Sequence, residues 1–99
     1  MMSDKSDNAS AILRDILVDA LRVDPAEIVP EARIFGDLFA ESIDLLDIQF
    51  QLERAFGLSL DQNELVENLG QGLSAKEIDE RLTVQWCLDY IEHRLATEL

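Results

Sequence analysis

The chain has 99 residues, of which 47% are hydrophobic, and this predicts one folded domain with one modest core over residues 1–99. Its formal net charge of −13 argues against binding to nucleic acid or to an anionic membrane surface, and it favours partners that present Lys and Arg. The charge alone is also typical of an acidic protein whose surface only keeps it in solution.

The cysteine content and the first residues bear on the compartment. Cys87 is the only cysteine, so no internal disulfide is possible, which fits a reducing cytosol and a cytoplasmic protein. No apolar run approaches the length of a membrane span. The first ten residues are polar and lack a signal-peptide core, and we expect residues 1–8 to be flexible.

Apolar residues at helical spacing predict three main helices, over residues 9–22, 42–56 and 83–96. Asn8 or Ser10 is suited to cap the first of them. A long connection, stiffened by two prolines, precedes the second helix. We expect five apolar residues to pin this connection to the core, namely Ile28, Ile34, Phe35, Leu38 and Phe39.

The second predicted helix has an apolar stripe that should face the core. Its members are Leu45, Ile48, Leu52 and Phe56, with Leu46 and Phe50 beside them. Gly57 is a natural stop, because glycine tolerates the left-handed cap conformation. Helix-start signals at Asp61 and Ser74 predict one or two short helices within residues 61–81. With no strand alternation visible, the fold class is all-α, a bundle of three main helices with short helices before the last.

Ser42 stands at the predicted start of the second helix. A serine in this position is usually an N-cap. The surrounding sequence lacks the glycines of a nucleophile elbow and His93 is the only histidine, so we expect no catalytic residue. The acids do not follow an EF-hand pattern, and Cys87 with His93 does not make a zinc site, so we expect no metal. A serine that receives a phosphate group from an external enzyme needs only exposure, and a helix N-terminus offers amides to that phosphate.

The acidic residues are concentrated around Ser42. Residues 24–67 include 11 acids and 2 bases, a net charge of −9, whereas the 23 residues before them contribute −1 and the 32 residues after them −3. Because carboxylates repel a phosphate group, we do not expect them to hold it. We expect them to form a face on which basic partner proteins dock. The alternative is a solvated helix face.

An ordered set of residues, within about 12–94, resembles the acyl carrier protein family. The matches are 23–28, Pro30, Glu31, Asp37, Leu38, Ser42, Asp44, Leu46, Ile48, Glu53, Phe56, Gly57, 83–85 and 88–91. Glu41-Ser42-Ile43 stands where the family usually has Asp-Ser-Leu, and Phe39 stands where it commonly has glycine.

The resemblance implies that Ser42 carries 4′-phosphopantetheine, transferred from coenzyme A by a magnesium-dependent transferase. The protein would then be a non-catalytic monomer that holds acyl groups as thioesters for fatty-acid or lipid biosynthesis. Acyl-loading and acyl-transfer enzymes with basic surfaces would recognise four acidic residues, Glu41, Asp44, Asp47 and Asp37. The alternatives are a discrete carrier for a polyketide or aminoacyl pathway, and an unmodified acidic helical module in which Ser42 is only a cap.

The segment 60–82 is longer than in the housekeeping carriers and resembles the specialised carriers used for lipid A acylation. We expect it to widen or extend an acyl site, the alternative being an insert that only decorates the surface. The candidate residues of the acyl pocket are Leu46, Ile48, Phe50, Leu65, Leu69 and Ile78.

Overall fold

The computed structural model describes residues 8–97, with the side chain of Gln62 excepted, and this part of the chain is helical throughout its regular structure. Its elements are α1 (Ala9–Leu21), the 3-10 turn η1 (Pro25–Glu27), α2 (Ser42–Phe56), α3 (Gln62–Leu69), α4 (Ala75–Arg81) and α5 (Val84–Thr97). The prediction of an all-α bundle is confirmed, and each main helix agrees with its predicted bounds to within one residue. The expectation of a flexible start lies almost entirely outside the described residues.

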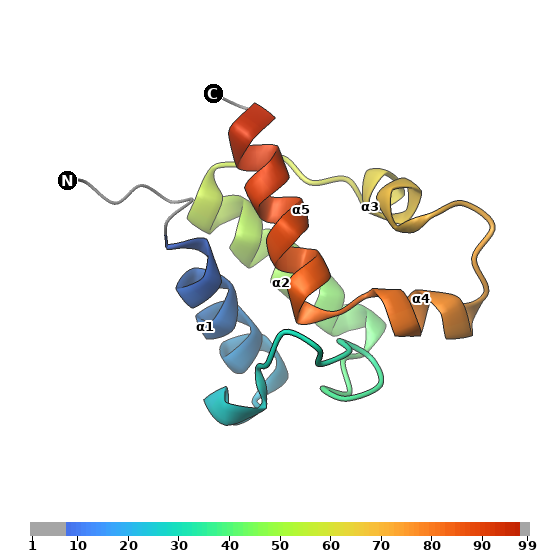
Figure 1. Cartoon of the computed structure of the whole chain (residues 1–99). Coiled ribbons are helices and arrows are strands. Elements are labelled where there is room, and N and C mark those ends of the chain that lie inside the picture. Colours follow the sequence, from blue (N-terminus) through green and yellow to red (C-terminus); the bar gives the residue numbers. More distant parts are fainter. Residues whose placement is uncertain (1–7, 98–99) are drawn as a thin grey trace.

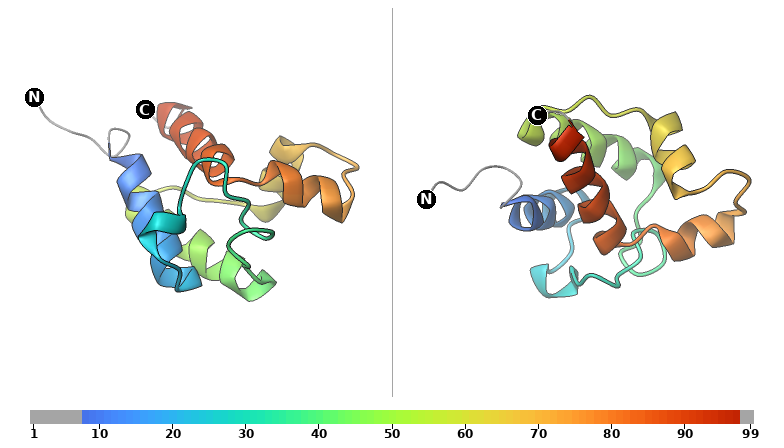
Figure 2. Two further views of the ribbon diagram at one scale, coloured as in Figure 1. Left: turned by 60° about the horizontal axis from the view of Figure 1, so that its bottom comes forward. Right: turned by 45° about the horizontal axis from the view of Figure 1, so that its top comes forward.

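Helices α1, α2 and α5 form the body of the bundle, and α1 packs against both of the others. Helices α3 and α4 lie on the side of this body that faces away from α1 (Figures 1 and 2). The four most deeply buried large side chains are Leu13, Leu17, Ile34 and Ile91, so the core joins α1, α5 and the long connection. Within residues 8–97, no helix combines the length and the apolar character needed to cross a bilayer.

The predicted helix ends have the expected local chemistry. Gly57 ends α2 with a φ of 68°, in the left-handed region that glycine tolerates. Ser74 and Glu77 form a capping box at the start of α4, where the Ser74 amide donates to Glu77 Oε1 at 3.0 Å and the Glu77 amide donates to Ser74 Oγ at 3.2 Å. These bonds from Ser74 lower the pKa of Glu77. Ser10 lies inside α1, and Asn8 occupies the N-cap position.

The long connection is fixed to the bundle by apolar and polar contacts. Ile34 and Leu38 are buried, as expected. Arg33 pairs its backbone with Thr83 in an isolated bridge, and its guanidinium bonds to Asp37 and, at 3.0 Å, to Asp79 on α4. These contacts hold the connection, and with it the start of α2, against α4 and the start of α5.

Phe39 does not pin the connection to the core, and that expectation was wrong. Its side chain is 77% exposed, and its backbone has a φ of 60°. This conformation turns the chain toward α2 and directs the ring outward. It also explains why glycine suits this position, since a residue with a Cβ is strained at positive φ.

Candidate functional site

Ser42 is the first residue of α2 and is exposed, while Glu41 occupies the N-cap position. The Glu41 amide donates to Asp44 Oδ2 at 2.8 Å, so an acidic side chain satisfies the backbone group that precedes the helix. The Ser42 side chain makes no hydrogen bond to any residue that the structure describes. Reading Ser42 as a helix cap is therefore wrong, and its hydroxyl is available to an external enzyme.

Beside Ser42 the bundle has an apolar cavity of about 310 Å³ that is partly open to solvent. Ser42, Leu45 and Leu52 of α2 form part of its wall, opposite side chains from the three later helices. Those side chains are Leu65, Val66 and Leu69 of α3, Ile78 of α4, and Trp86, Cys87, Tyr90 and Ile91 of α5. The segment before the last helix therefore supplies part of the wall of this cavity.

Four of the six residues predicted for an acyl pocket line the cavity, namely Ile48, Leu65, Leu69 and Ile78. Leu46 and Phe50 do not, and their side chains are 44% and 56% exposed. Placing them in the pocket was wrong, because residues four apart share one face of a helix and this face of α2 points outward. With Ile43 they form an exposed apolar stripe next to Ser42.

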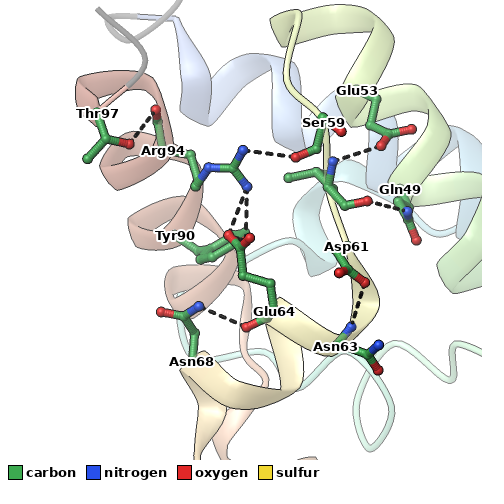
Figure 3. Close-up of polar contacts among 11 residues, drawn as sticks. Gln49, Glu53, Ser59, Asp61, Asn63, Glu64, Asn68, Tyr90, Arg94 and Thr97 are labelled. Carbon is green, nitrogen blue, oxygen red and sulfur yellow. Dashed lines mark hydrogen bonds and ion pairs between the residues drawn. The ribbon is translucent and has the colours of Figure 1, made fainter.

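The segment between α2 and α3 is held by two polar side chains of α2, shown in Figure 3. Gln49 Nε2 donates to the Leu60 carbonyl at 2.9 Å, and the Leu60 amide donates to Glu53 Oε2 at 2.8 Å. Leu60 and Gln49 both line the cavity. Gln49 was not among the predicted site residues, although a polar residue seven positions after Ser42, on the apolar side of α2, is a visible signal.

Helix α3 is held over the cavity by a cluster on α5 (Figure 3). Glu64 Oε1 accepts hydrogen bonds from the Tyr90 hydroxyl at 2.9 Å and from Arg94 Nη1 at 3.0 Å. Arg94 Nη2 also donates to the Ser59 carbonyl at 2.8 Å, just before α3. The Tyr90 ring stacks on Trp86 with 5.4 Å between ring centroids, and burial raises the pKa of Tyr90.

The predicted recognition acids lie around the start of α2 but differ in their contacts. Glu41 and Asp47 are exposed, and Asp44 is half-buried and engaged in the cap. Asp37 is exposed, and hydrogen bonds from the Arg33 side chain and backbone lower its pKa. Asp37 therefore has a structural contact of its own, which closes the turn before Ser42.

Two further residues with reactive side chains, Cys87 and His93, lie outside any cluster of functional groups among residues 8–97. Cys87 is partly buried against the cavity, and burial raises the pKa of its thiol to about 12, so the nucleophilic thiolate is scarce near neutral pH. His93 is exposed on α5. Within the described part of the chain, no three His, Cys, Asp or Glu side chains gather in a way that would hold a metal ion.

Comparison with known proteins agrees with this geometry. The family model described as "Phosphopantetheine attachment site" matches residues 11–70. The chain is 34% identical over 84 residues to "Acyl carrier protein" of Amoebophilus asiaticus (strain 5a2), a match that covers 83% of this chain and 86% of that protein. It is 35% identical over 85 residues to "Acyl carrier protein" of Rubrobacter xylanophilus (strain DSM 9941 / JCM 11954 / NBRC 16129 / PRD-1), which covers 85% of this chain and 89% of that protein.

The chain belongs to the acyl carrier protein family. It carries acyl groups on a 4′-phosphopantetheine prosthetic group. Members of this family are generally non-catalytic carriers that interact with a phosphopantetheinyl transferase and with acyl-handling enzymes. The residues present fit such a group, since an exposed hydroxyl at a helix N-terminus adjoins an apolar cavity.

Proposed function

We propose that Ser42 bears the phosphopantetheine arm and that the cavity beside it shelters the acyl chain. The observation that carries this proposal is the position of Ser42, whose hydroxyl is exposed, makes no hydrogen bond within the described part of the chain, and adjoins an apolar cavity of about 310 Å³. When bound, phosphopantetheine supplies a thiol that holds acyl groups as thioesters. The first-turn amides of α2 favour a phosphate group at Ser42.

The apolar cavity suits an acyl chain because it removes methylene groups from water. Each buried methylene contributes about 0.8 kcal/mol, so a chain of moderate length gains several kcal/mol by entering. A covalent tether makes this entry intramolecular, with a high effective concentration. The chain would be protected between partners and would leave the cavity when a partner enzyme offers an equally apolar channel.

The acidic residues near Ser42 are the proposed docking face for basic partner enzymes. Glu41 and Asp47 are exposed, and residues 24–67 carry a net charge of −9. Charges of this kind act mainly on the rate of association and on partner choice. Asp44 and Asp37 would contribute to the same negative field while keeping their internal contacts. In this account the protein is a cytoplasmic, monomeric carrier without turnover of its own.

For the cargo, we propose a long acyl chain used in fatty-acid or lipid biosynthesis, including lipid A. The support is the segment between α2 and α5, which contributes Leu65, Val66, Leu69 and Ile78 to the cavity wall. A polyketide or aminoacyl carrier is the weaker alternative, because an apolar cavity suits a polar cargo poorly.

The test is an intact mass measurement after incubation with coenzyme A, magnesium and a broad-specificity phosphopantetheinyl transferase. We expect the wild-type protein to gain the mass of one arm and Ser42→Ala to gain none. Ser59→Ala, which removes another exposed serine hydroxyl, should gain the arm normally. Circular dichroism should show Ser42→Ala fully folded, because the Ser42 side chain makes no hydrogen bond to any described residue. A folded wild-type protein that gains no mass would contradict the proposal.

A further inference from the structure

Phe39 is a large apolar residue that the fold itself does not use. It is 77% exposed, the highest value among the large apolar residues of the described chain. Its ring does not line the cavity beside Ser42. An exposed aromatic ring leaves a large apolar area in water, and at a φ of 60° the backbone also carries strain that glycine would avoid. The stability of the fold therefore gives no reason for a phenylalanine at this position.

The backbone around Phe39 holds the ring outside the bundle. Leu38 and Ala40, on either side of it, are only 3% and 8% exposed, so both neighbours are anchored in the core. The Phe39 amide donates to the Phe35 carbonyl at 3.1 Å. The Ala40 amide donates to the Ile34 carbonyl at 3.0 Å. Because both neighbours are buried and both amides are bonded, the ring is a preorganised contact that loses little freedom when a partner covers it.

Phe39 also lies close to the proposed attachment site. It is three residues before Ser42, so the two Cα atoms are at most about 11 Å apart. Even a small interface between two proteins covers about 600 Å² on each partner, a disc of roughly 14 Å radius. On the other side of Ser42 in the chain, Ile43 is 69% exposed and adds to the apolar surface. Position 39 therefore lies within the contact area of an enzyme that docks around Ser42.

The surroundings of Phe39 determine what such an enzyme must offer. An apolar recess accommodates the ring favourably, because it removes the ring from water. Glu41, which is exposed between Phe39 and Ser42, calls for Lys or Arg at the rim of that recess. An enzyme whose surface closely fits a small residue at this position instead clashes with the ring, and such a clash lowers the affinity for the wrong partner.

We propose that Phe39 is a specificity-determining residue of this carrier. Enzymes with an apolar recess for the ring can dock around Ser42, and the ring excludes enzymes whose surface closely fits a glycine at this position. The inference rests on the proposed function, because it concerns enzymes that act on an arm borne by Ser42. Phe39 touches no reacting atom, so the ring changes KM for the carrier and leaves kcat largely unaffected.

The test uses a malonyl-transferring enzyme whose own carrier has glycine at the position of Phe39. A broad-specificity transferase first attaches the arm to the wild type, Phe39→Gly, Phe39→Ala and Phe50→Ala, and intact mass checks that each conversion is complete. Both kcat and KM are then measured for transfer of the malonyl group from coenzyme A to the thiol of the arm. Phe50 is the matched control, because it is also an exposed phenylalanine but lies about two helical turns beyond Ser42 on the outer face of α2.

We expect Phe39→Gly and Phe39→Ala each to lower KM for the carrier by about tenfold or more, because both lack the ring. Phe50→Ala should not lower KM. The converse change, from glycine to phenylalanine in the enzyme's own carrier, should raise KM by a similar factor. If the enzyme loads none of the four proteins, this converse change decides the question. Circular dichroism checks that every variant is folded.

Three results would overturn the inference. An unchanged KM in both Phe39 variants would show that the ring does not restrict docking. A lower KM in Phe39→Gly alone would assign the effect to the strained backbone. An equal effect of Phe50→Ala would assign it to exposed apolar surface in general. Failure of the arm to attach at Ser42 would remove the proposed function as well, whereas attachment without any effect of the ring removes only this inference.

Discussion

Arg94 on α5 holds Glu64 on α3, with Arg94 Nη1 3.0 Å from Glu64 Oε1. The Arg94 side chain is only 13% exposed, whereas that of Glu64 is 44% exposed. The Tyr90 hydroxyl bonds the same carboxylate oxygen, and Arg94 also reaches the Ser59 carbonyl. This cluster ties α3 to α5 at the wall of the cavity.

Replacing Arg94 by methionine should loosen α3. Methionine keeps most of the aliphatic stem but loses the bonds to Glu64 and Ser59, so we expect the free energy of unfolding to fall by about 1–2 kcal/mol. Hydrogen exchange should accelerate most at the amides of α3. Arg54→Met, at an exposed position of α2, is the control and should change stability by about 0.5 kcal/mol or less. Equal effects of the two substitutions on α3 exchange would contradict this role of Arg94.

At position 39, glycine should stabilise the fold more than alanine does, which is the reverse of their usual order in loops. In most loops alanine is the more stabilising residue, because glycine has more freedom in the unfolded chain. At a φ of 60°, however, any residue with a Cβ is strained. We therefore expect Phe39→Gly to be more stable than Phe39→Ala by roughly 1 kcal/mol in urea unfolding. Because the ring is mostly exposed, little burial is lost in either variant. A more stable alanine variant would show that the strain is absent.

Asp37 should contribute to acid sensitivity. Arg33 lowers the pKa of Asp37 in the folded state, so the unfolded chain binds a proton there at a higher pH than the folded chain does. The contribution to stability is complete above the ordinary carboxyl pKa of about 4 and is lost as the pH falls below it. Urea midpoints measured from about pH 5 to about pH 3 should fall less steeply in Asp37→Asn than in the wild type. Asp47→Asn, which removes an exposed carboxylate, should keep the wild-type slope. Identical slopes in all three proteins would refute the role of Asp37.

Cys87 should report on the contents of the cavity. Burial raises the pKa of its thiol to about 12, so alkylation by iodoacetamide should be slow at neutral pH and should quicken as the pH rises toward that value. A dodecanoyl chain attached at Ser42 should slow it further, because Cys87 lines the cavity that the chain fills. The rate is read by mass spectrometry of the Cys87 peptide, with urea-unfolded protein as the fast reference. If the chain leaves the rate unchanged, it does not reach Cys87.

Helix positions were readable from the sequence because apolar spacing and cap residues are local signals. The starts of α3 and α4 followed from Asp61 and Ser74, and the end of α2 followed from Gly57. The face of α2 was harder, because Leu46 and Phe50 are apolar yet point away from the core. Residue type does not say whether an apolar helix face is covered by the protein itself.

The site was only partly predictable from the sequence, because its details depend on the exact start of a helix and on contacts between distant residues. Ser42 lies one residue inside α2 rather than at its cap, a shift within the ordinary uncertainty of helix ends that changes the role of its hydroxyl. The acceptor for Gln49 is the Leu60 carbonyl, which no local pattern reveals. For the left-handed backbone of Phe39, the only signal in the sequence was that the family commonly has glycine at this position.

The central claim is that an acyl chain attached at Ser42 enters the cavity between α2 and the later helices. The most direct test is isotope-filtered NMR on protein that carries a ¹³C-labelled dodecanoyl chain. The account predicts nuclear Overhauser effects between the chain and the methyl groups of Leu65, Leu69 and Ile78. Contacts with Leu46 and Phe50 on the outer face of α2, without any to those three residues, would contradict it.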